Sequence, residues 1–366
     1  MRTRHSRTCS RSLPAPAPRT RCAGSLVAAV VALLSWRVSV VLPVSVGVLG
    51  GCGGDAPPPA TAPPALDAKA RETAIEAIRT RLLERNLAEA TAVAQALVER
   101  SPEDPAANAW SARVLVALAA EPATSEEERR RLIADASRQL EVAIAGGVDD
   151  RETLAVAASC DEAMGEFDRA TARWRQLVAQ HPEDSVAVAR QGLAIARAGR
   201  LDEARELLED AVRRFDEDAL VLAALGEVRL EQGDETGLLL FADARRLDPS
   251  ATALRVREAV WQRRLGRPAE AVTLLAALPD SERVTPAVAR ELAASWRALG
   301  EPRKVAEVFE ASARSSPRSI APWLLAAEAW LDAGEPGRAL EAMEIANSID
   351  PSDAELARLR ERLRPG

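Results

Sequence analysis

The sequence predicts an all-α solenoid of about eight helix-turn-helix units, and three observations lead to this fold class. Six glycines recur at an almost constant spacing, and small residues stand at fixed distances on both sides of each glycine. Only 3% of the 366 residues are aromatic, and no run of alternating β-branched residues follows the amino-terminal segment. A chain with this periodicity buries its apolar side chains between neighbouring repeats and not around one centre.

The repeated unit is clearest between Ser185 and Asp218, where two amphipathic runs lie on either side of Gly199. Apolar and small residues recur at spacings of three and four in both runs, which is typical of helices with one buried face. A glycine between two helices readily adopts the positive φ that ends the first helix and turns the chain. The six turn glycines are Gly165, Gly199, Gly233, Gly266, Gly300 and Gly334.

Small residues at two further positions indicate that the two helices of each unit approach closely, because small side chains let helix backbones come near each other. Five positions after the turn glycines stand Ala170, Ala204, Leu238, Ala271, Val305 and Ala339. Seven positions before them stand Ala158, Gly192, Gly226, Ala259, Ala293 and Ala327. We expect the turn glycines and these alanines to be the structural positions of the repeat.

This pattern resembles that of the tetratricopeptide repeat family, which has a period of about 34 residues and a fixed order of large and small residues. The last full unit matches it at Trp323, Ala327, Trp330, Gly334, Ala339, Met343, Ala346 and Pro351. The chain departs from the family in having no tyrosine, and Trp296, Trp330 and Ile195 stand at that position. The resemblance implies a right-handed superhelix whose first helices line a concave, protein-binding face.

Residues 1–51 resemble the signal peptide of a bacterial lipoprotein and are set aside from the fold. They contain seven arginines and no acid, and an apolar stretch leads to Leu49-Gly50-Gly51-Cys52. In such signals small residues precede a cysteine that is acylated, so the resemblance implies a covalent lipid, such as palmitate, on Cys52. The alternative is an uncleaved membrane helix over residues 23–50, which is long enough to span but carries Arg37 near its centre at a high cost.

Residues 52–66 are rich in glycine, alanine and proline and predict a semi-extended linker with no core of its own. Such a linker would hold the solenoid away from a membrane surface. Gly53, not aspartate, follows the cysteine. By the sorting rule of enteric bacteria, this implies an outer-membrane anchor with the solenoid facing the periplasm.

The rest of the chain divides into three parts. Residues 67–150 predict two degenerate units; Arg85 replaces the turn glycine of the first, and an insertion around residues 121–131 separates the helices of the second. Residues 151–353 predict six regular units. Residues 354–366 predict a charged amphipathic helix that caps the last apolar face.

The net charge argues against nucleic acid as a partner. The whole chain carries −7, and removing residues 1–51 with their seven arginines lowers this to −14. A protein of this charge repels a phosphate backbone, and no basic stripe with interleaved aromatic residues is present in the sequence.

Residue types that carry catalysis are scarce. After Gly51 the chain has one histidine, His181, and two cysteines, Cys52 and Cys160. The sequence has no metal-ligand spacing, no nucleophile motif and no phosphate-binding loop. We therefore expect no catalytic residue, metal site, cofactor or small-molecule substrate, and we interpret Cys160 as a buried structural thiol.

Two sets of residues are candidates for partner binding on the concave face that the resemblance implies. An apolar strip on the fourth and fifth units would suit an amphipathic helix or an extended peptide. The alternative is that neighbouring helices or the linker cover this strip. Its candidate contact residues are Val186, Leu193, Leu220 and Leu230.

The second set consists of four arginines on the sixth and seventh units, which could clamp a carboxylate or an acidic segment. The alternative is that they pair with Glu328 and Asp332 of the eighth unit. The chaperone-binding branch of the family uses a lysine and asparagine clamp, whose asparagine positions carry other residues here. The four arginines are Arg263, Arg264, Arg290 and Arg297.

These observations predict a membrane-anchored scaffold lipoprotein that mediates protein–protein interactions in a bacterial cell-envelope complex and is not an enzyme. One alternative is an accessory lipoprotein of a secretion, pilus or exopolysaccharide-export machine. An alternative of another class is a regulatory subunit or an enzyme module, which would need a cleft with perturbed titratable groups.

Overall fold

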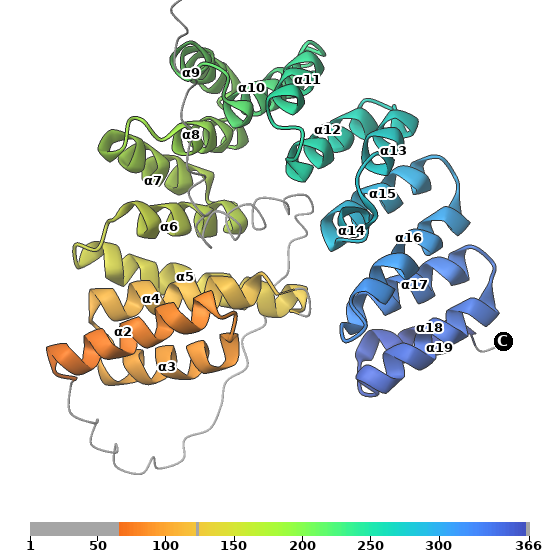
Figure 1. Cartoon of the computed structure of the whole chain (residues 1–366), viewed down its shortest axis with the longest axis horizontal. Coiled ribbons are helices and arrows are strands. Elements are labelled where there is room, and N and C mark those ends of the chain that lie inside the picture. The colour runs from red at the N-terminus through yellow and green to blue at the C-terminus, as the bar shows by residue number, and fades with distance from the viewer. Residues whose placement is uncertain (1–65, 122–123, 364–366) are drawn as a thin grey trace, which may run out of the picture.

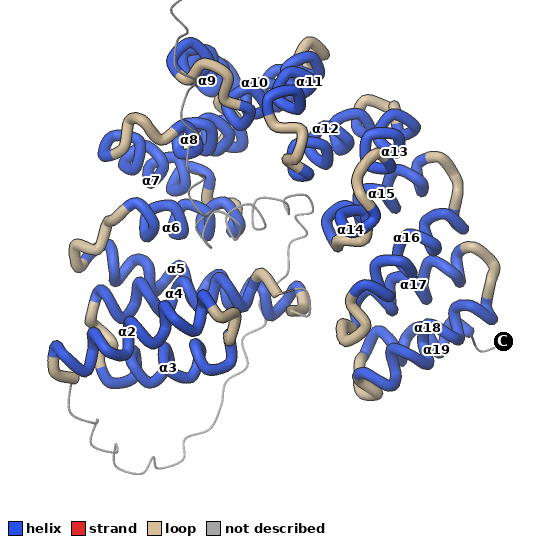
Figure 2. The backbone as a smooth tube through the Cα atoms, viewed as in Figure 1, coloured by secondary structure: helices blue, strands red, loops and turns tan. Residues whose placement is uncertain are grey.

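The computed structural model describes residues 66–121 and 124–363, which contain 18 helices, α2 to α19, and no strand. The all-α solenoid predicted from the sequence is confirmed. Successive helices pack against each other in pairs joined by short loops (Figure 2). The predicted signal peptide, Cys52 and nearly all of the predicted linker lie outside the described residues.

Eight helix pairs make up the described part of the solenoid, and each has a first and a second helix. The first helices are α2 (Ala68–Leu83), α4 (Pro105–Ala119), α6 (Arg151–Met164), α8 (Ser185–Arg197), α10 (Ala219–Glu231), α12 (Thr252–Arg264), α15 (Pro286–Ala298) and α17 (Ile320–Asp332). The second helices are α3 (Leu87–Arg100), α5 (Glu126–Ala145), α7 (Phe167–Gln180), α9 (Leu201–Arg214), α11 (Gly237–Leu247), α13 (Pro268–Ala276), α16 (Pro302–Ser315) and α18 (Pro336–Ile349).

The helix pairs follow one another along an arch (Figure 1). One leg runs from α2 to α9, the top is crossed by α10, α11 and α12, and the other leg runs down to α19 (Ala354–Leu363). A short helix, α14 (Asp280–Arg283), lies between α13 and α15. At the carboxyl-terminal end, α19 packs on α17 and α18 and buries Leu356 and Leu359, so it covers the apolar face of the last pair.

Each regular unit turns at its glycine in the same way. Gly199 has φ of 83°, and its N–H donates to the carbonyl of Ala196 while the N–H of Arg200 donates to Ile195. This pair of bonds is the Schellman arrangement, which satisfies the last carbonyls of the first helix and needs a left-handed residue. In the first unit Arg85 stands at this place with φ of 58°, so a non-glycine residue carries the strain there.

The helices of a pair cross where small residues face each other. Ala170, Ala204, Ala271 and Ala339 are fully buried at these crossings. In the fourth unit a Cβ atom added at Gly192 would lie 2.6 Å from Cγ of Leu208, so the contact leaves no room for a methyl group. Small residues on both sides of the turn are therefore a steric requirement of the hairpin.

The fifth unit departs from the expected register by one residue. Gly237 and Phe241 are buried at the crossing, whereas Leu238, expected there from its distance to Gly233, is only half-buried. The segment between the turn glycine and the crossing is thus one residue shorter than in the other regular units. This shortening explains why the interval from Gly233 to Gly266 is one residue shorter than the other intervals between turn glycines.

Aspartates at the start of four first helices, α4, α6, α8 and α10, join each of these helices to the preceding unit. The side chain of Asp184 accepts the N–H of Ala187 and caps α8, and it also accepts Nε of Arg151 at 2.6 Å. Asp104 and Asp218 cap α4 and α10 and accept in the same way from residues 33 positions upstream, Arg71 and Ser185. Each of these caps therefore serves two helices.

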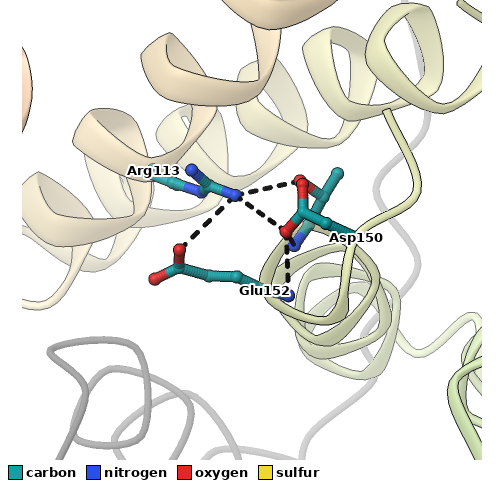
Figure 3. A network of polar contacts seen from close by, with 4 residues as sticks. Arg113, Asp150 and Glu152 are labelled. Atoms are coloured by element: carbon teal, nitrogen blue, oxygen red, sulfur yellow. Dashed lines mark hydrogen bonds and ion pairs between the residues drawn. The ribbon is translucent and has the colours of Figure 1, made fainter. Parts of the chain in front are cut away.

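The link at the cap of α6 uses a buried arginine (Figure 3). Asp150 accepts the N–H groups of Glu152 and Thr153, and Nη2 of Arg113 from α4 lies 3.3 Å from its carboxylate. Burial raises the pKa of Asp150, but the hydrogen bonds from Thr153 and the charge of Arg113 outweigh it and lower the pKa overall. The long second unit is thereby fastened to the third by an arginine that is almost fully buried.

We predict that Gly237→Ala destabilises the solenoid by about 2 kcal/mol, because the added Cβ would lie 2.4 Å from the carbonyl oxygen of Gly226. Gly337→Ala is the matched control, since Gly337 is also helical and a Cβ there meets no atom within 4 Å. The denaturant midpoint, followed by circular dichroism, should fall for the first variant only. Equal midpoints for both variants would contradict the close crossing.

Candidate partner-binding site

The structure divides the predicted apolar strip into exposed and buried residues. Val186 and Leu220 are 39% and 40% exposed, but Leu193 and Leu230 are only 6% and 4% exposed. Leu193 packs between α8 and α10, and Leu230 packs against residues of α11 and α12. The expectation of a continuous exposed strip is therefore wrong at these two leucines, and the alternative that neighbouring helices cover the strip holds there.

The four predicted clamp arginines do not come together as one clamp. Arg263 donates to both carboxylate oxygens of Glu291 on α15, with Nε–Oε1 of 2.6 Å and Nη2–Oε2 of 3.1 Å. The neighbouring Arg264 lies 3.4 Å from Glu231 on α10 and stacks over Trp261. The hydrogen bond to Glu291 raises the pKa of Arg263. Arg263 is thus occupied in joining α12 to α15.

The other two arginines lie on α15 and are exposed. Nε of Arg290 donates to the carbonyl of Pro286 in its own helix. Over the ranges that the structure describes, the Arg297 guanidinium takes part in no hydrogen bond or ion pair. The expected pairing with Glu328 and Asp332 is wrong, because Arg362 of α19 lies within 3.5 Å of both. Arg297 therefore remains a candidate contact by itself.

Ion pairs between neighbouring first helices recur along the solenoid. Besides the pairs of Arg263 and Arg264, Glu162 of α6 pairs with Arg197 of α8, and Glu227 of α10 pairs with Arg257 of α12. The acidic partners lie on α6, α10 and α15, and the arginines lie on α8 and α12. Each ion pair therefore joins the first helices of two consecutive units. Ion pairs placed in this way favour one alignment of each first helix on the next.

Five of these side chains gather in one place, which we name the central charge cluster: Glu162, Arg190, Arg197, Glu227 and Arg257. Glu162 accepts Nη1 of Arg197 at 2.9 Å and the indole N–H of Trp174 at 2.7 Å, and Nη1 of Arg190 lies 3.8 Å away. Arg257 donates its Nε to Glu227. The cluster spans α6, α8, α10 and α12 and holds three guanidinium groups and two carboxylates.

The charged groups of the cluster affect one another's pKa values. Burial lowers the pKa of Arg190, Glu162 and Glu227 raise it, and Arg257 and Arg197 lower it further, so the pKa is lowered overall. Burial raises the pKa of Glu227, but Arg257, Arg197 and Arg190 together outweigh it and the pKa is lowered. Three arginines thus act on Glu227, which remains ionised well below neutral pH.

Sequence reasoning named none of the three cluster arginines as a candidate, although a signal was present. Arg190 and Arg257 both stand nine positions before their turn glycines, and Glu291 stands at the same place in the seventh unit. The other regular units have Val156, Ala224 and Leu325 there. Charged residues in an otherwise apolar column of a repeat indicate contacts between units, and comparing such columns would have found them.

Within residues 66–121 and 124–363, no three histidine, cysteine, aspartate or glutamate side chains are grouped so as to hold a metal ion. Over the same ranges, no helix combines the length and hydropathy needed to cross a bilayer. Cys160 is fully buried, and burial raises its thiol pKa to about 12, so it is unreactive at neutral pH.

The geometry defines a helical-repeat solenoid with a charged face along its first helices, and the comparisons specify its family. The family model described as "Tetratricopeptide repeat" matches residues 161–219 and 190–237, from α6 into α11. The matched residues form tetratricopeptide repeats. Repeats of this kind form protein–protein interaction scaffolds, and the fold is generally non-catalytic.

Solved structures that align with this chain have low sequence identity to it. A tetratricopeptide repeat protein from Parabacteroides merdae is 15% identical, with 81% of this chain and 99% of that chain covered and a TM-score of 0.44. The human IFIT1 dimer with PPP-AAAA is 14% identical, with 77% and 73% covered and a TM-score of 0.44.

The APC/C hetero-tetramer Cut9-Hcn1 is 14% identical, with 82% of this chain covered and a TM-score of 0.39. This chain spans 57% of the length of that one. In the comparison with curated proteins, no sequence matches the chain.

We predict that Arg263→Ala destabilises the solenoid by about 2 kcal/mol, because it leaves the Glu291 carboxylate, 8% exposed, without its guanidinium partner. The adjacent Arg264→Ala should change stability by less than about 1 kcal/mol, since that pair is roughly half exposed on both sides. Thermal or denaturant unfolding of the two variants checks the difference. A larger loss of stability for Arg264→Ala than for Arg263→Ala would contradict the conclusion that the Arg263–Glu291 pair is the stronger link.

Proposed function

We propose that this chain is a lipid-anchored scaffold that holds partner proteins together in a bacterial cell-envelope complex. The observation that carries the proposal is the combination of tetratricopeptide repeats with Leu49-Gly50-Gly51-Cys52 after an apolar stretch. A solenoid of this kind presents an extended surface to other proteins. A lipid on the cysteine would keep that surface at the membrane.

The anchor in this proposal is a single acylated residue, Cys52, followed by a proline-rich linker that keeps the solenoid off the bilayer. The proposed location is the outer membrane, with the solenoid facing the periplasm. Gly53 after the cysteine supports this choice, because aspartate at that position is the inner-membrane signal in enteric bacteria.

The proposed partners are proteins or peptides and not nucleic acid. The net charge of −14 without residues 1–51 opposes binding of a phosphate backbone. Arg297, Val186 and Leu220 are sequence-predicted contact residues that remain exposed in the structure. They support a partner that carries both apolar and acidic groups.

We predict that Cys52→Ser abolishes acylation and leaves a larger, unprocessed precursor. The reason is that serine lacks the thiol that carries the lipid. Metabolic labelling with a fatty-acid probe, followed by electrophoresis, should show label on the wild-type chain only. Equal labelling of both chains would reject the lipoprotein assignment.

We predict that cross-linking in membranes, followed by capture of the full-length chain, recovers a defined set of envelope proteins. Arg297→Glu should weaken capture of any partner that uses an acidic contact at α15, because it places a like charge opposite that partner. Arg246→Glu is the control, since Arg246 is an exposed residue of α11 whose ion pair lies within its own helix. Recovery of no protein by the wild-type chain would reject the scaffold.

A further inference from the structure

The two legs of the arch are joined between α11 and α12, and this junction is the loosest between successive units of the described chain (Figure 1). Elsewhere each second helix packs closely on the first helix of the next unit, but α11 approaches α12 over a shorter stretch. Similarly, α8 packs closely on α10, whereas α10 and α12 have almost no close backbone approach. The backbone therefore constrains the fifth and sixth units less than other neighbouring units.

The junction also lacks the shared aspartate cap that joins earlier units. Among the described residues, Ala251 stands at the cap position of α12 and makes no side-chain hydrogen bond to it. The residues that lead into this position, 247–250, are exposed. The chain can thus change direction before α12 without breaking a helix cap.

A small apolar contact crosses the junction. Leu254 and Trp261 of α12 are buried in one cluster with Leu230 of α10 and with Phe241 and Ala244 of α11. The hydrophobic effect is non-directional, so it keeps the two units together but does not by itself fix the angle between them. A directional interaction is needed to hold one arrangement of the legs.

Four ion pairs across the same junction supply that directional interaction. Arg245 of α11 pairs with Glu258 of α12 at 2.6 Å. The other three pairs join acids of the fifth unit, spaced four positions apart along α10 and its turn, to arginines of α12 and its turn. These pairs are Glu227 with Arg257, Glu231 with Arg264, and Glu235 with Arg267. An acidic row of one unit is thereby held against a basic row of the next.

The ion pairs differ in exposure, and exposure decides how they respond to salt. In the pairs of Glu231 and Glu235, every side chain is between 41% and 54% exposed. Glu227 and Glu258 are much more enclosed, at 18% and 6%. Exposed charges are screened beyond about 10 Å at 0.1 M salt and beyond about 3 Å at 1 M, whereas enclosed pairs are screened much less. Rising salt should therefore weaken the two outer pairs selectively.

From these contacts we propose that the junction between α11 and α12 is a hinge, which the outer pairs Glu231–Arg264 and Glu235–Arg267 hold in the described arrangement. When these pairs are weakened, the legs move as two bodies about the apolar contact at Trp261. Ionic strength, or a partner that contacts both legs, then sets the width of the arch. The inference goes beyond the proposed function, because it depends on neither a lipid nor a particular partner.

The hinge is tested by distances between and within the legs of the full-length chain in detergent. Spin labels are attached to an unnatural amino acid with a ketone side chain, so that none of the four cysteines takes part. One pair of labels replaces Glu206 of α9 and Glu344 of α18, which are exposed and lie on opposite legs. The reference pair replaces Glu206 and Glu72 of α2, which lie on the same leg.

Double electron–electron resonance gives the distance distribution of each pair of labels. Raising salt from about 0.1 M to about 1 M should broaden the distribution between positions 206 and 344 about twofold, because the outer ion pairs are screened. The distribution between positions 72 and 206 should stay unchanged. Circular dichroism at both salt concentrations should show the same helix content, because the legs move without unfolding.

Charge exchange tests the outer ion pairs directly. Glu231→Arg combined with Glu235→Arg should broaden the distribution between the legs about twofold at about 0.1 M salt, because like charges then face Arg264 and Arg267. Adding Arg264→Glu and Arg267→Glu places opposite charges together again and should restore the narrow distribution. These side chains are about half exposed, so the exchange leaves the buried core intact.

Asp243→Arg is the matched control and should leave both distributions unchanged, since Asp243 pairs with Arg246 within α11. A narrow distribution between the legs at both salt concentrations would reject the hinge. Equal broadening for the two pairs of labels would place the motion along the whole solenoid, and loss of helix at high salt would assign it to unfolding; either result overturns the proposal. Failure of the four-residue exchange to restore the narrow distribution would reject the outer ion pairs as the interaction that holds the legs.

Discussion

The whole solenoid depends on the close crossing of two helices at small residues. Ala204 and Gly192 meet the facing helix with no space for a larger group, and the same contact recurs in each regular unit. Leu208 and Phe241 fill the crossings inside their own hairpins, and the apolar clusters around them continue into the next unit. Stacking is therefore a consequence of the hairpin, and the solenoid is stable as an array and not as separate units.

Repetition in the sequence made the fold predictable. The turn glycines repeat six times, and the small residues and the apolar spacing recur in most of these units, so chance agreement at one unit could not mislead the prediction. The fifth unit shows the limit of this approach, because a fixed offset from Gly233 selects Leu238 whereas the chain uses Gly237. The loss of one residue between Gly233 and α11 shifts which residues of α11 face α10. The burial of Gly237 and Phe241 at the crossing shows where this shift occurs.

The site was much harder to predict than the fold. The four arginines were chosen by their position on the first helices, but the position of a side chain does not identify the group it pairs with. Glu291, on the next first helix, occupies Arg263, and Arg362 takes the acids expected to pair with the others. For Leu193 and Leu230 the sequence left exposure and coverage by neighbouring helices both open, because the spacing of residues gives a helix face but not the distance to the next helix; the structure buries both.

The shared aspartate caps give the two legs of the arch different cooperativity. In the second to fifth units, the residue that caps a first helix is also bonded to the preceding unit at Asp104, Asp150, Asp184 and Asp218. The starts of α12, α15 and α17 have no side-chain cap. Unfolding one amino-terminal unit thus removes a bond from the start of the next helix, so these units melt together. The carboxyl-terminal units lack these shared caps and are joined instead by packing and by ion pairs such as that of Arg263 with Glu291, so we expect local opening to begin at α19.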